Sequence, residues 1–502
     1  MTNLRIALTL PGVVSGGAFQ GGAVAALVVA LGEVNGEAPD SAQLDVITGA
    51  SSGALTAVLA AWTLLAGVDP LPVLHRAWVT GPSLKSLRPA RGERAPLSLR
   101  AARDVADQAF RRPGPRVAGA AQRQPLTLDM ALCSLRPLEY AIRRRSGPPL
   151  RAASHLDWAT HRLHPGGGRR PGSSYDDWMA ATDAAIASAS NALAFLPRRL
   201  NRDAERQRYL DYGVEDLPAA LNLWYTDGSL VDTQPLERCL HVARRADERE
   251  AGCGQRVILV VRPGALDEGP GAPVQGGAPR WSQTLGDAVR IITTHSLYAD
   301  LLRLEKTNSR LRWTSDLADL LSAALTDRPD AAEELTAFLR ALDADKSAYG
   351  RHEVGTPRVP AGDVRALVNA ALRAATGLEG KDEVRVEVVG GGADVFPLGF
   401  GGFLDGRARA RAFAAGYDRM LSWLSDPGRG PAALGLDPSL AESAAAAAAR
   451  QASRSWAEGR GLPIGDEHSA GRLVGLAGLA VRSARVAVGD AWRGSRRGTR
   501  LR

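Results

Sequence analysis

Cysteine is scarce in this chain. Only Cys133, Cys239 and Cys253 occur among 502 residues, and no two of them have C-x-x-C spacing. A disulfide framework and a cysteine zinc site are therefore not expected, and no other residues indicate a metal or a cofactor. Reduced thiols in a cytoplasmic protein are the simplest interpretation.

Long apolar segments are also missing. No run of 18 residues is free of polar breaks, and the nearest candidates, 23–31 and 54–67, have the length of core helices. The first three residues lead directly into the apolar run 4–10, without the charged region, long apolar region and cleavage site of a signal peptide. We therefore expect a protein that is neither secreted nor membrane-spanning.

Net positive charge is small outside the C-terminal end. The formal net charge is +8, and residues 482–502 supply +6 of it, with seven arginines against Asp490. The remaining +2 leaves no basic face of the kind that nucleic-acid-binding domains carry, so nucleic acid is not an expected partner. Leu473, Leu476 and Leu479 recur at helical spacing just before this tail. The segment can lie on an anionic membrane surface as a peripheral contact, or its apolar face can pack on the main domain.

Composition and length indicate a folded protein larger than one simple core. Hydrophobic residues make up 45% and charged residues 23%, as in globular chains, and 502 residues exceed the size at which single cores stop growing. We predict an α/β domain over 1–425 with irregular insertions at about 81–125 and 164–174, the first followed by helical stretches around 130–145. An Ala/Arg-rich helical extension with the basic tail follows at 426–502.

The first seventy residues alternate between two kinds of segment. Compact apolar runs at 4–10 and 44–48 alternate with the helix-forming stretches 23–31 and 52–67. A β-α-β-α opening favours a mainly parallel central sheet covered by helices on both faces. In such sheets ligands bind beyond the carboxyl ends of the strands, so functional residues are expected in the loops that follow them.

One of these loops contains a candidate nucleophile. Residues 49–53, Gly-Ala-Ser-Ser-Gly, match the G-x-S-x-G elbow, in which Gly49 and Gly53 permit a sharp strand-to-helix turn that exposes the Ser51 hydroxyl. The five residues are weak evidence alone, but a strand-like run precedes them and a helix-forming stretch follows. The alternative is a glycine-rich turn in which Ser51 or Ser52 caps the helix.

A glycine-rich loop follows the first strand and can stabilise an oxyanion. Backbone N–H groups at such loops commonly hold the negative oxygen that forms during acyl transfer. The candidate donors are the amides of Gly12, Val13, Val14, Gly16 and Gly17. The alternative is a phosphate-binding loop, but neither G-x-G-x-x-G nor a P-loop lysine is present in order.

After the nucleophile and the oxyanion donors, the third component of such a site is a general base. The eight histidines do not clearly supply one. His155, His161 and His164 fall in a polar region read as irregular, and His295 falls in a helical one. A carboxylate can accept the serine proton directly, and Asp227, in Trp-Tyr-Thr-Asp-Gly-Ser after a strand-like segment, is the candidate. An ordinary Asp-Gly turn accounts for the same residues.

These blocks resemble the patatin-like phospholipases. The glycine-rich loop 12–17, the G-x-S-x-G serine and an aspartate in D-G-G/A occur there in the same chain order. Residues 187–190 and 195–197 are similar to the family's A-S-x-A and F-P stretches, and the likeness covers about 4–425 in scattered blocks. The resemblance implies a Ser51–Asp227 dyad without histidine that hydrolyses acyl esters of phospholipids or other lipids, as a phospholipase A does.

The loop departs from the family pattern G-G-G-x-R/K-G. Val13 and Val14 stand where the family has glycines, and the basic residue is absent. Valine keeps its N–H, although β-branching restricts its backbone. A second alignment over 16–21 keeps more glycines but begins further from the strand. Two alternatives stay open: a catalytically impaired fold retained for lipid or partner binding, and a Ser-His-Asp esterase that uses one of the histidines.

Overall fold

The computed structural model describes most of the chain up to residue 457. The described residues are 3–457, apart from 84, 115–121, 143–147, 167–171, 215–216, 250–254, 265–280, 326–327, 329, 348–362, 379–380 and 392–399. The predictions for the tail, including its amphipathic segment, lie outside the described residues. Cys253 and part of the predicted loop 164–174 lie outside them as well.

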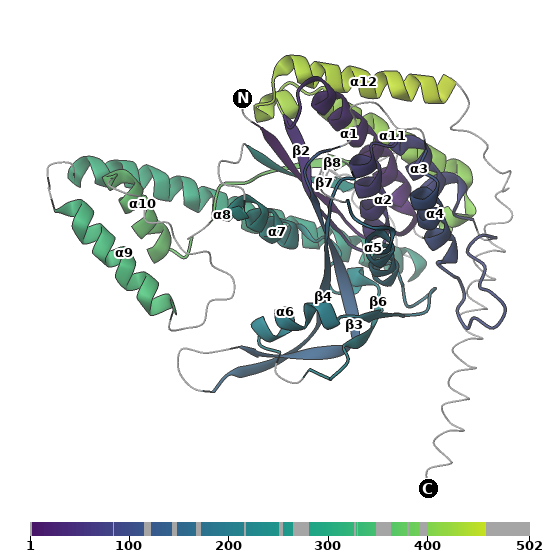
Figure 1. The fold of residues 1–502 in the computed structure, drawn as a ribbon, viewed down its shortest axis with the longest axis horizontal. Helices are drawn as coiled ribbons and strands as arrows, with labels where there is room; N and C mark the ends of the chain where they lie inside the picture. The colour runs from purple at the N-terminus through teal and green to yellow at the C-terminus, as the bar shows by residue number, and fades with distance from the viewer. Residues whose placement is uncertain are drawn as a thin grey trace, which may run out of the picture.

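One mostly parallel sheet forms the centre of the described fold (Figure 1). Its strands are β1 (Leu4–Leu10), β2 (Ala42–Gly49), β3 (Leu126–Ile142), β4 (Leu150–Leu163), β5 (Arg198–Asn201), β6 (Asn222–Thr226), β7 (Arg256–Arg262) and β8 (Arg385–Gly390). Their order is β5-β6-β3-β2-β1-β7-β8, with β4 paired to β3. The strands from β3 to β8 along this order pair in parallel, and β4, β5 and β6 pair antiparallel. The predicted α/β class with a mainly parallel sheet is confirmed.

Helices cover both faces of the sheet. They are α1 (Gly17–Glu37), α2 (Ser52–Ala66), α3 (Pro70–His75), α4 (Arg100–Arg111), α5 (Tyr175–Ser188), α6 (Arg206–Asp211), α7 (Leu236–Arg249), α8 (Trp281–Leu325), α9 (Ala331–Ser347), α10 (Val364–Ala375), α11 (Gly406–Leu424) and α12 (Pro438–Ala457). Successive strand residues point to opposite faces. Ile6 and Leu8 of β1 accordingly join the core with α1, α2 and α11, whereas Ala7 joins a second core with α7. Helices α8, α9 and α10 extend away from this body on one side (Figure 1).

Two regions that the sequence predicted as helical or irregular are strands. The stretch around 130–145, predicted to be helical, belongs largely to β3, and the histidine-containing region 155–163 belongs to β4. The two strands pair with each other over most of their length, and β3 also pairs with β2. These pairings are long-range contacts that local propensity does not encode, so tertiary context overrides the local pattern.

The predicted irregular insertion contains an ordered helix. Within 81–125, α4 (Arg100–Arg111) places Ala106 and Phe110 in the main core. The helix expected around 444–449 is present as α12, and its alanines pack into the same core, beside α1 and α11. Small alanine side chains permit this close helix packing, which an Ala/Arg-rich composition alone did not indicate.

The N-terminal helical stretch is longer than the sequence suggested. The described segment Val14–Glu37 is long and apolar enough to cross a membrane by length and composition, although Gln20 and Glu33 interrupt its apolar residues. Its most apolar window is 89% buried inside the fold, as a core helix would be.

Cys133 and Cys239 are buried free thiols.

Candidate active site

The Ser51 turn has the geometry of a nucleophile elbow. Strand β2 ends at Gly49 and α2 begins at Ser52, with Ser51 between them at φ 51° and ψ −121°. A non-glycine residue at positive φ is strained, and such strain is common where a side chain must be held in a reactive position. A Cβ at Gly53 would lie 2.0 Å from the Leu10 carbonyl oxygen, so the tight turn requires glycine there.

We predict that Gly53→Ala destabilises the protein by several kcal/mol, because the new methyl group meets backbone rather than a movable side chain. Gly166→Ala is the matched control, since no atom of the described residues lies within 4 Å of a Cβ built there. Urea unfolding of both variants checks the prediction. Equal free energies of unfolding for the two would contradict it.

Ser51 and Asp227 meet across 176 residues of sequence. The Ser51 Oγ donates a hydrogen bond of 3.2 Å to Asp227 Oδ2, within the 4 Å expected from the sequence. Ser51 is 5% exposed and Asp227 1% exposed. Asp227 follows β6 directly. A Cβ at the next residue, Gly228, would lie 2.0 Å from the Ala131 carbonyl oxygen, so the turn after Asp227 requires glycine.

The Asp227 carboxylate is held by further donors. Asn191 Nδ2 donates to Oδ2 at 3.1 Å, and Ser229 donates to Oδ1 from its backbone N at 3.0 Å and from its Oγ at 2.6 Å. A carboxylate that accepts bonds on both oxygens has a fixed orientation. Oδ2 therefore faces the serine while Oδ1 is anchored in its own loop.

Two residues of the site were not assigned a role from the sequence. Ser188 Oγ accepts a hydrogen bond of 2.9 Å from the Ser51 backbone N and donates one of 2.6 Å to the Ala131 carbonyl, so it ties the elbow to β3. Asn191 is the second residue. Ser188 ends α5 and lies within 187–190, so the A-S-x-A resemblance was its available signal, whereas Asn191 follows that stretch.

The glycine-rich loop is bonded differently from the prediction. The Gly12 amide donates to the Thr233 carbonyl at 3.0 Å, and the Val13 amide donates to Ser52 Oγ at 2.9 Å. Gly16 and Gly17 donate within the loop, to the carbonyls of Val13 and Val14 respectively. Four of the five predicted oxyanion donors are thus engaged elsewhere, because the loop is anchored to its neighbours.

Val14 is the remaining amide. Within the described residues its N–H donates no hydrogen bond, and neither does that of Ser52 at the first position of α2. Val14 has φ 53°, a conformation that β-branched residues rarely adopt and glycine adopts freely. Both residues line the cavity that contains Ser51 and Asp227. Both amides therefore lie beside the dyad without an acceptor among the described residues.

The dyad lies in an apolar cavity of about 920 Å³, the space at its mouth included. Its other walls come from α2, α4, α5 and the segment 76–80, and include Leu55, Trp78 and Phe403. Five of the lining residues are polar, and four of these are the dyad itself and the neighbouring residues Ser52 and Asn191. A pocket of this composition suits a ligand with a long apolar part and one polar reacting group.

No histidine with a described side chain lines this cavity. His155 and His161 lie on β4, and His164 follows it. Burial, with a smaller contribution from the nearby Arg202, lowers the pKa of His161 to about 4. The side chain of His295 lies outside the described residues.

Asp232, in the loop after Asp227, has a perturbed carboxyl group. Burial, followed by the charge of Asp300 and then that of Glu237, raises its pKa to about 7 from an ordinary value of 3.8. The folded protein therefore keeps a proton that the unfolded chain releases, and wild-type stability falls as the pH rises from about 4 to 7.

We predict that Asp232→Asn raises the free energy of unfolding at pH 8 by about 1–3 kcal/mol, because the amide carries no charge to bury. Below about pH 4 the variant and the wild type differ little, since the carboxyl group is then protonated in both states. Urea unfolding at pH 4, 6 and 8 measures this. A variant less stable than wild type at pH 8 would contradict the prediction.

The fold and site together define an α/β protein with a buried serine–aspartate pair at the end of an apolar cavity. Within the described residues, no group of three or more His, Cys, Asp or Glu side chains could hold a metal ion. No family model and no curated protein matches the chain. Among solved structures, VipD from Legionella pneumophila is similar with a TM-score of 0.25 and 11% identity, over 91% of this chain and 77% of that one.

Proposed function

We propose that this protein is a serine acyl hydrolase with a patatin-like core that cleaves acyl esters of lipids, as a phospholipase A does. The observation that carries the proposal is the 3.2 Å hydrogen bond from Ser51 to Asp227 at the end of an apolar cavity. A nucleophile paired with a base, beside unengaged amides, is the arrangement that acyl transfer requires.

In the first step Ser51 Oγ attacks the ester carbonyl carbon and its proton passes to Asp227 Oδ2. The carbonyl oxygen becomes negative, and the amides of Val14 and Ser52 stabilise it. The intermediate then collapses, the alcohol leaves with the proton from Asp227, and the acyl group remains on Ser51. The bonds to Asn191 and Ser229 keep the carboxylate in place throughout.

In the second step Asp227 takes a proton from water, which attacks the acyl-enzyme carbonyl and forms a second intermediate. Collapse of this intermediate releases the fatty acid and returns the proton to Ser51 Oγ. One ester and one water give one acid and one alcohol, so no cofactor is consumed.

The test is turnover together with a covalent label. Purified protein should release fatty acid from a phospholipid and p-nitrophenol from its acyl esters, and a fluorophosphonate should label Ser51 in the intact protein, as mass spectrometry would show. Label on another serine would contradict the proposal.

The two alternatives give different results in the same assays. A catalytically impaired protein would bind lipid with no turnover and no label. A Ser-His-Asp esterase would lose turnover on His295→Ala or His352→Ala while Asp227→Asn stayed active.

A further inference from the structure

The cavity has the form of a channel that starts at the dyad and runs along three helices. On α2 the lining residues run from Ser52 to Leu59, and on α4 from Ala101 to Ala106. On α5, which runs in the opposite direction, they run from Ala189 back to Thr182. Leu99, just before α4, packs with Leu55 and Ala189 near the dyad, so α4 runs away from Ser51 in the same direction as α2.

Three aromatic side chains stand one helical turn beyond the last lining residue on each helix. Trp62 follows Leu59, Phe110 follows Ala106, and Trp178 precedes Thr182. Trp62 contacts Phe110 at 5.0 Å and Trp178 at 5.2 Å between ring centroids, and Phe110 lies 5.7 Å from Trp178. The three helices therefore converge on one aromatic cluster at the far end of the channel.

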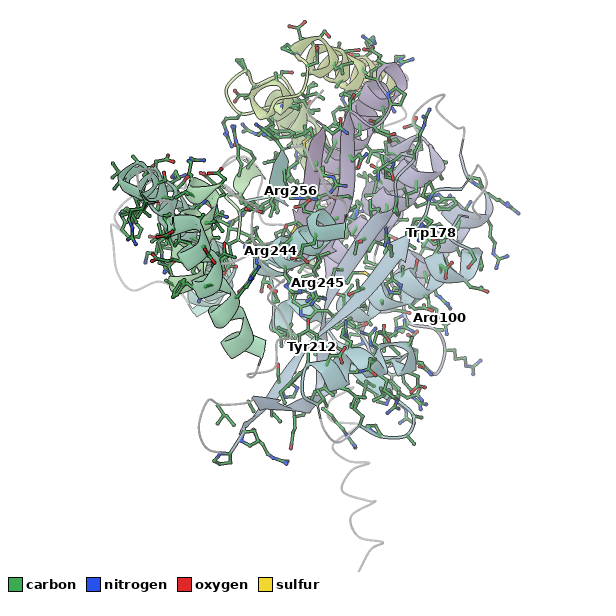
Figure 2. All side chains as sticks on the ribbon, turned by 60° about the vertical axis from the view of Figure 1, so that its left-hand side comes forward. Arg100, Trp178, Tyr212, Arg244, Arg245 and Arg256 are labelled. Atoms are coloured by element: carbon green, nitrogen blue, oxygen red, sulfur yellow. The ribbon has the colours of Figure 1, made fainter. Side chains whose placement is uncertain are left out.

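The side chains that line the cavity are mostly apolar, although the indole N–H of Trp78 is buried without a hydrogen-bond partner in the described part of the chain. Thr182 is the one polar lining residue away from the dyad, and its hydroxyl donates to the Trp178 carbonyl at 2.9 Å. Figure 2 labels Arg100, at the dyad end of α4, and Trp178, at the aromatic end of α5, on the same side of the molecule but apart from each other. A saturated hydrocarbon chain fits such walls, since every polar group buried there without a partner would cost free energy.

We propose that the cluster of Trp62, Phe110 and Trp178 sets the acyl-chain length, so that the channel accepts chains of medium length, about eight to ten carbons. The eight residues from Ser51 to Leu59 span about 12 Å at 1.5 Å per helical residue. An extended chain with carbon–carbon bonds of about 1.5 Å advances about 1.25 Å per carbon, so about ten carbons reach Leu59, the last lining residue of α2 before the cluster. The inference rests on the proposed function for its reaction, but the binding of a fatty acid does not depend on turnover.

The experiment has a kinetic arm and a binding arm. In the kinetic arm, kcat/KM is measured for p-nitrophenyl esters of 4 to 16 carbons. We expect a maximum near 8 to 10 carbons and a fall of about tenfold or more by 16 carbons. In the binding arm, fatty acids of 6 to 16 carbons compete with a fluorescent fatty acid for Ser51→Ala protein, and the affinity should peak at the same length.

Variants at the aromatic cluster test its role directly. Trp62→Ala should move the maximum to longer chains and raise the relative rate at 16 carbons about tenfold. Phe110→Leu is a milder second variant for use if Trp62→Ala does not fold, and Ala106→Leu should shorten the preferred chain. Trp313→Ala removes a tryptophan that is 57% exposed on α8, and should leave the length profile unchanged.

Each outcome decides one of the two proposals. A binding maximum at 8 to 10 carbons without turnover keeps the channel and overturns the hydrolase. Turnover that is equal from 8 to 16 carbons keeps the hydrolase and overturns the channel limit. The channel limit is also overturned if the cluster variants fold but have the chain-length profile of the wild type. The absence of fatty-acid binding overturns it as well.

Discussion

Replacing Ser51 with alanine is expected to lower ester turnover by at least about 10³-fold, because Ser229, the other hydroxyl bonded to the Asp227 carboxylate, does not line the cavity. The loss should appear in kcat and in kcat/KM alike. The free energy of unfolding should change little, since the Ser51 amide keeps its bond to Ser188 and Asp227 Oδ2 keeps its bond to Asn191. Ester hydrolysis and urea unfolding of the same preparation measure both effects.

Ser52→Ala is the matched comparison, because it removes the neighbouring hydroxyl from the same turn. Ser52 Oγ accepts the Val13 amide, so its loss loosens the glycine-rich loop without removing the nucleophile. We expect kcat to fall about tenfold. This is less than the direct loss of an oxyanion donor causes, because the substitution affects the donors only through the loop. A Ser51→Ala variant more active than Ser52→Ala would assign the nucleophile elsewhere.

The sheet and the elbow could be predicted because their signals are local. The apolar runs 4–10 and 44–48 are buried on both faces of the sheet, so their composition alone indicated parallel strands. Strand β3 and helix α4 could not be predicted in this way. Their positions depend on pairing with β4 and on contacts of Phe110 with distant aromatic residues, which no short window contains.

The candidate site could likewise be predicted only in part. The Ser51–Asp227 contact was expected from chain order through the family resemblance. The rule that parallel strands end at one edge applies to Ser51 and the glycine-rich loop, whereas β6, which precedes Asp227, pairs antiparallel with β3. Which amides remain unengaged did not follow, because the Thr233 carbonyl and the Ser52 hydroxyl, which engage Gly12 and Val13, are brought there by tertiary structure. Residue type marks a possible donor, whereas hydrogen-bond partners decide whether that donor is still available.

The same reasoning makes Asp227→Asn the most informative change after Ser51→Ala. An asparagine amide has the shape of the carboxylate but cannot take the serine proton, so kcat should fall by at least about 10³-fold, as it does when a base of this kind is neutralised. Asp232→Asn, five residues further on, is the matched control and should keep its activity, because its carboxylate is not in contact with Ser51.

Asp227→Asn should also lose stability, unlike Ser51→Ala. If the new NH₂ group takes the place of Oδ2, it faces the Nδ2 donor of Asn191, and if it takes the place of Oδ1, it faces the Ser229 amide. In either orientation two N–H donors face each other in a buried site without an acceptor between them, which costs about 1–3 kcal/mol. Urea unfolding of Asp227→Asn and Ser51→Ala, measured together, should therefore separate the two variants even though both are inactive. A fully stable Asp227→Asn protein that still hydrolyses esters would show that this carboxylate is neither the base nor the anchor of the loop.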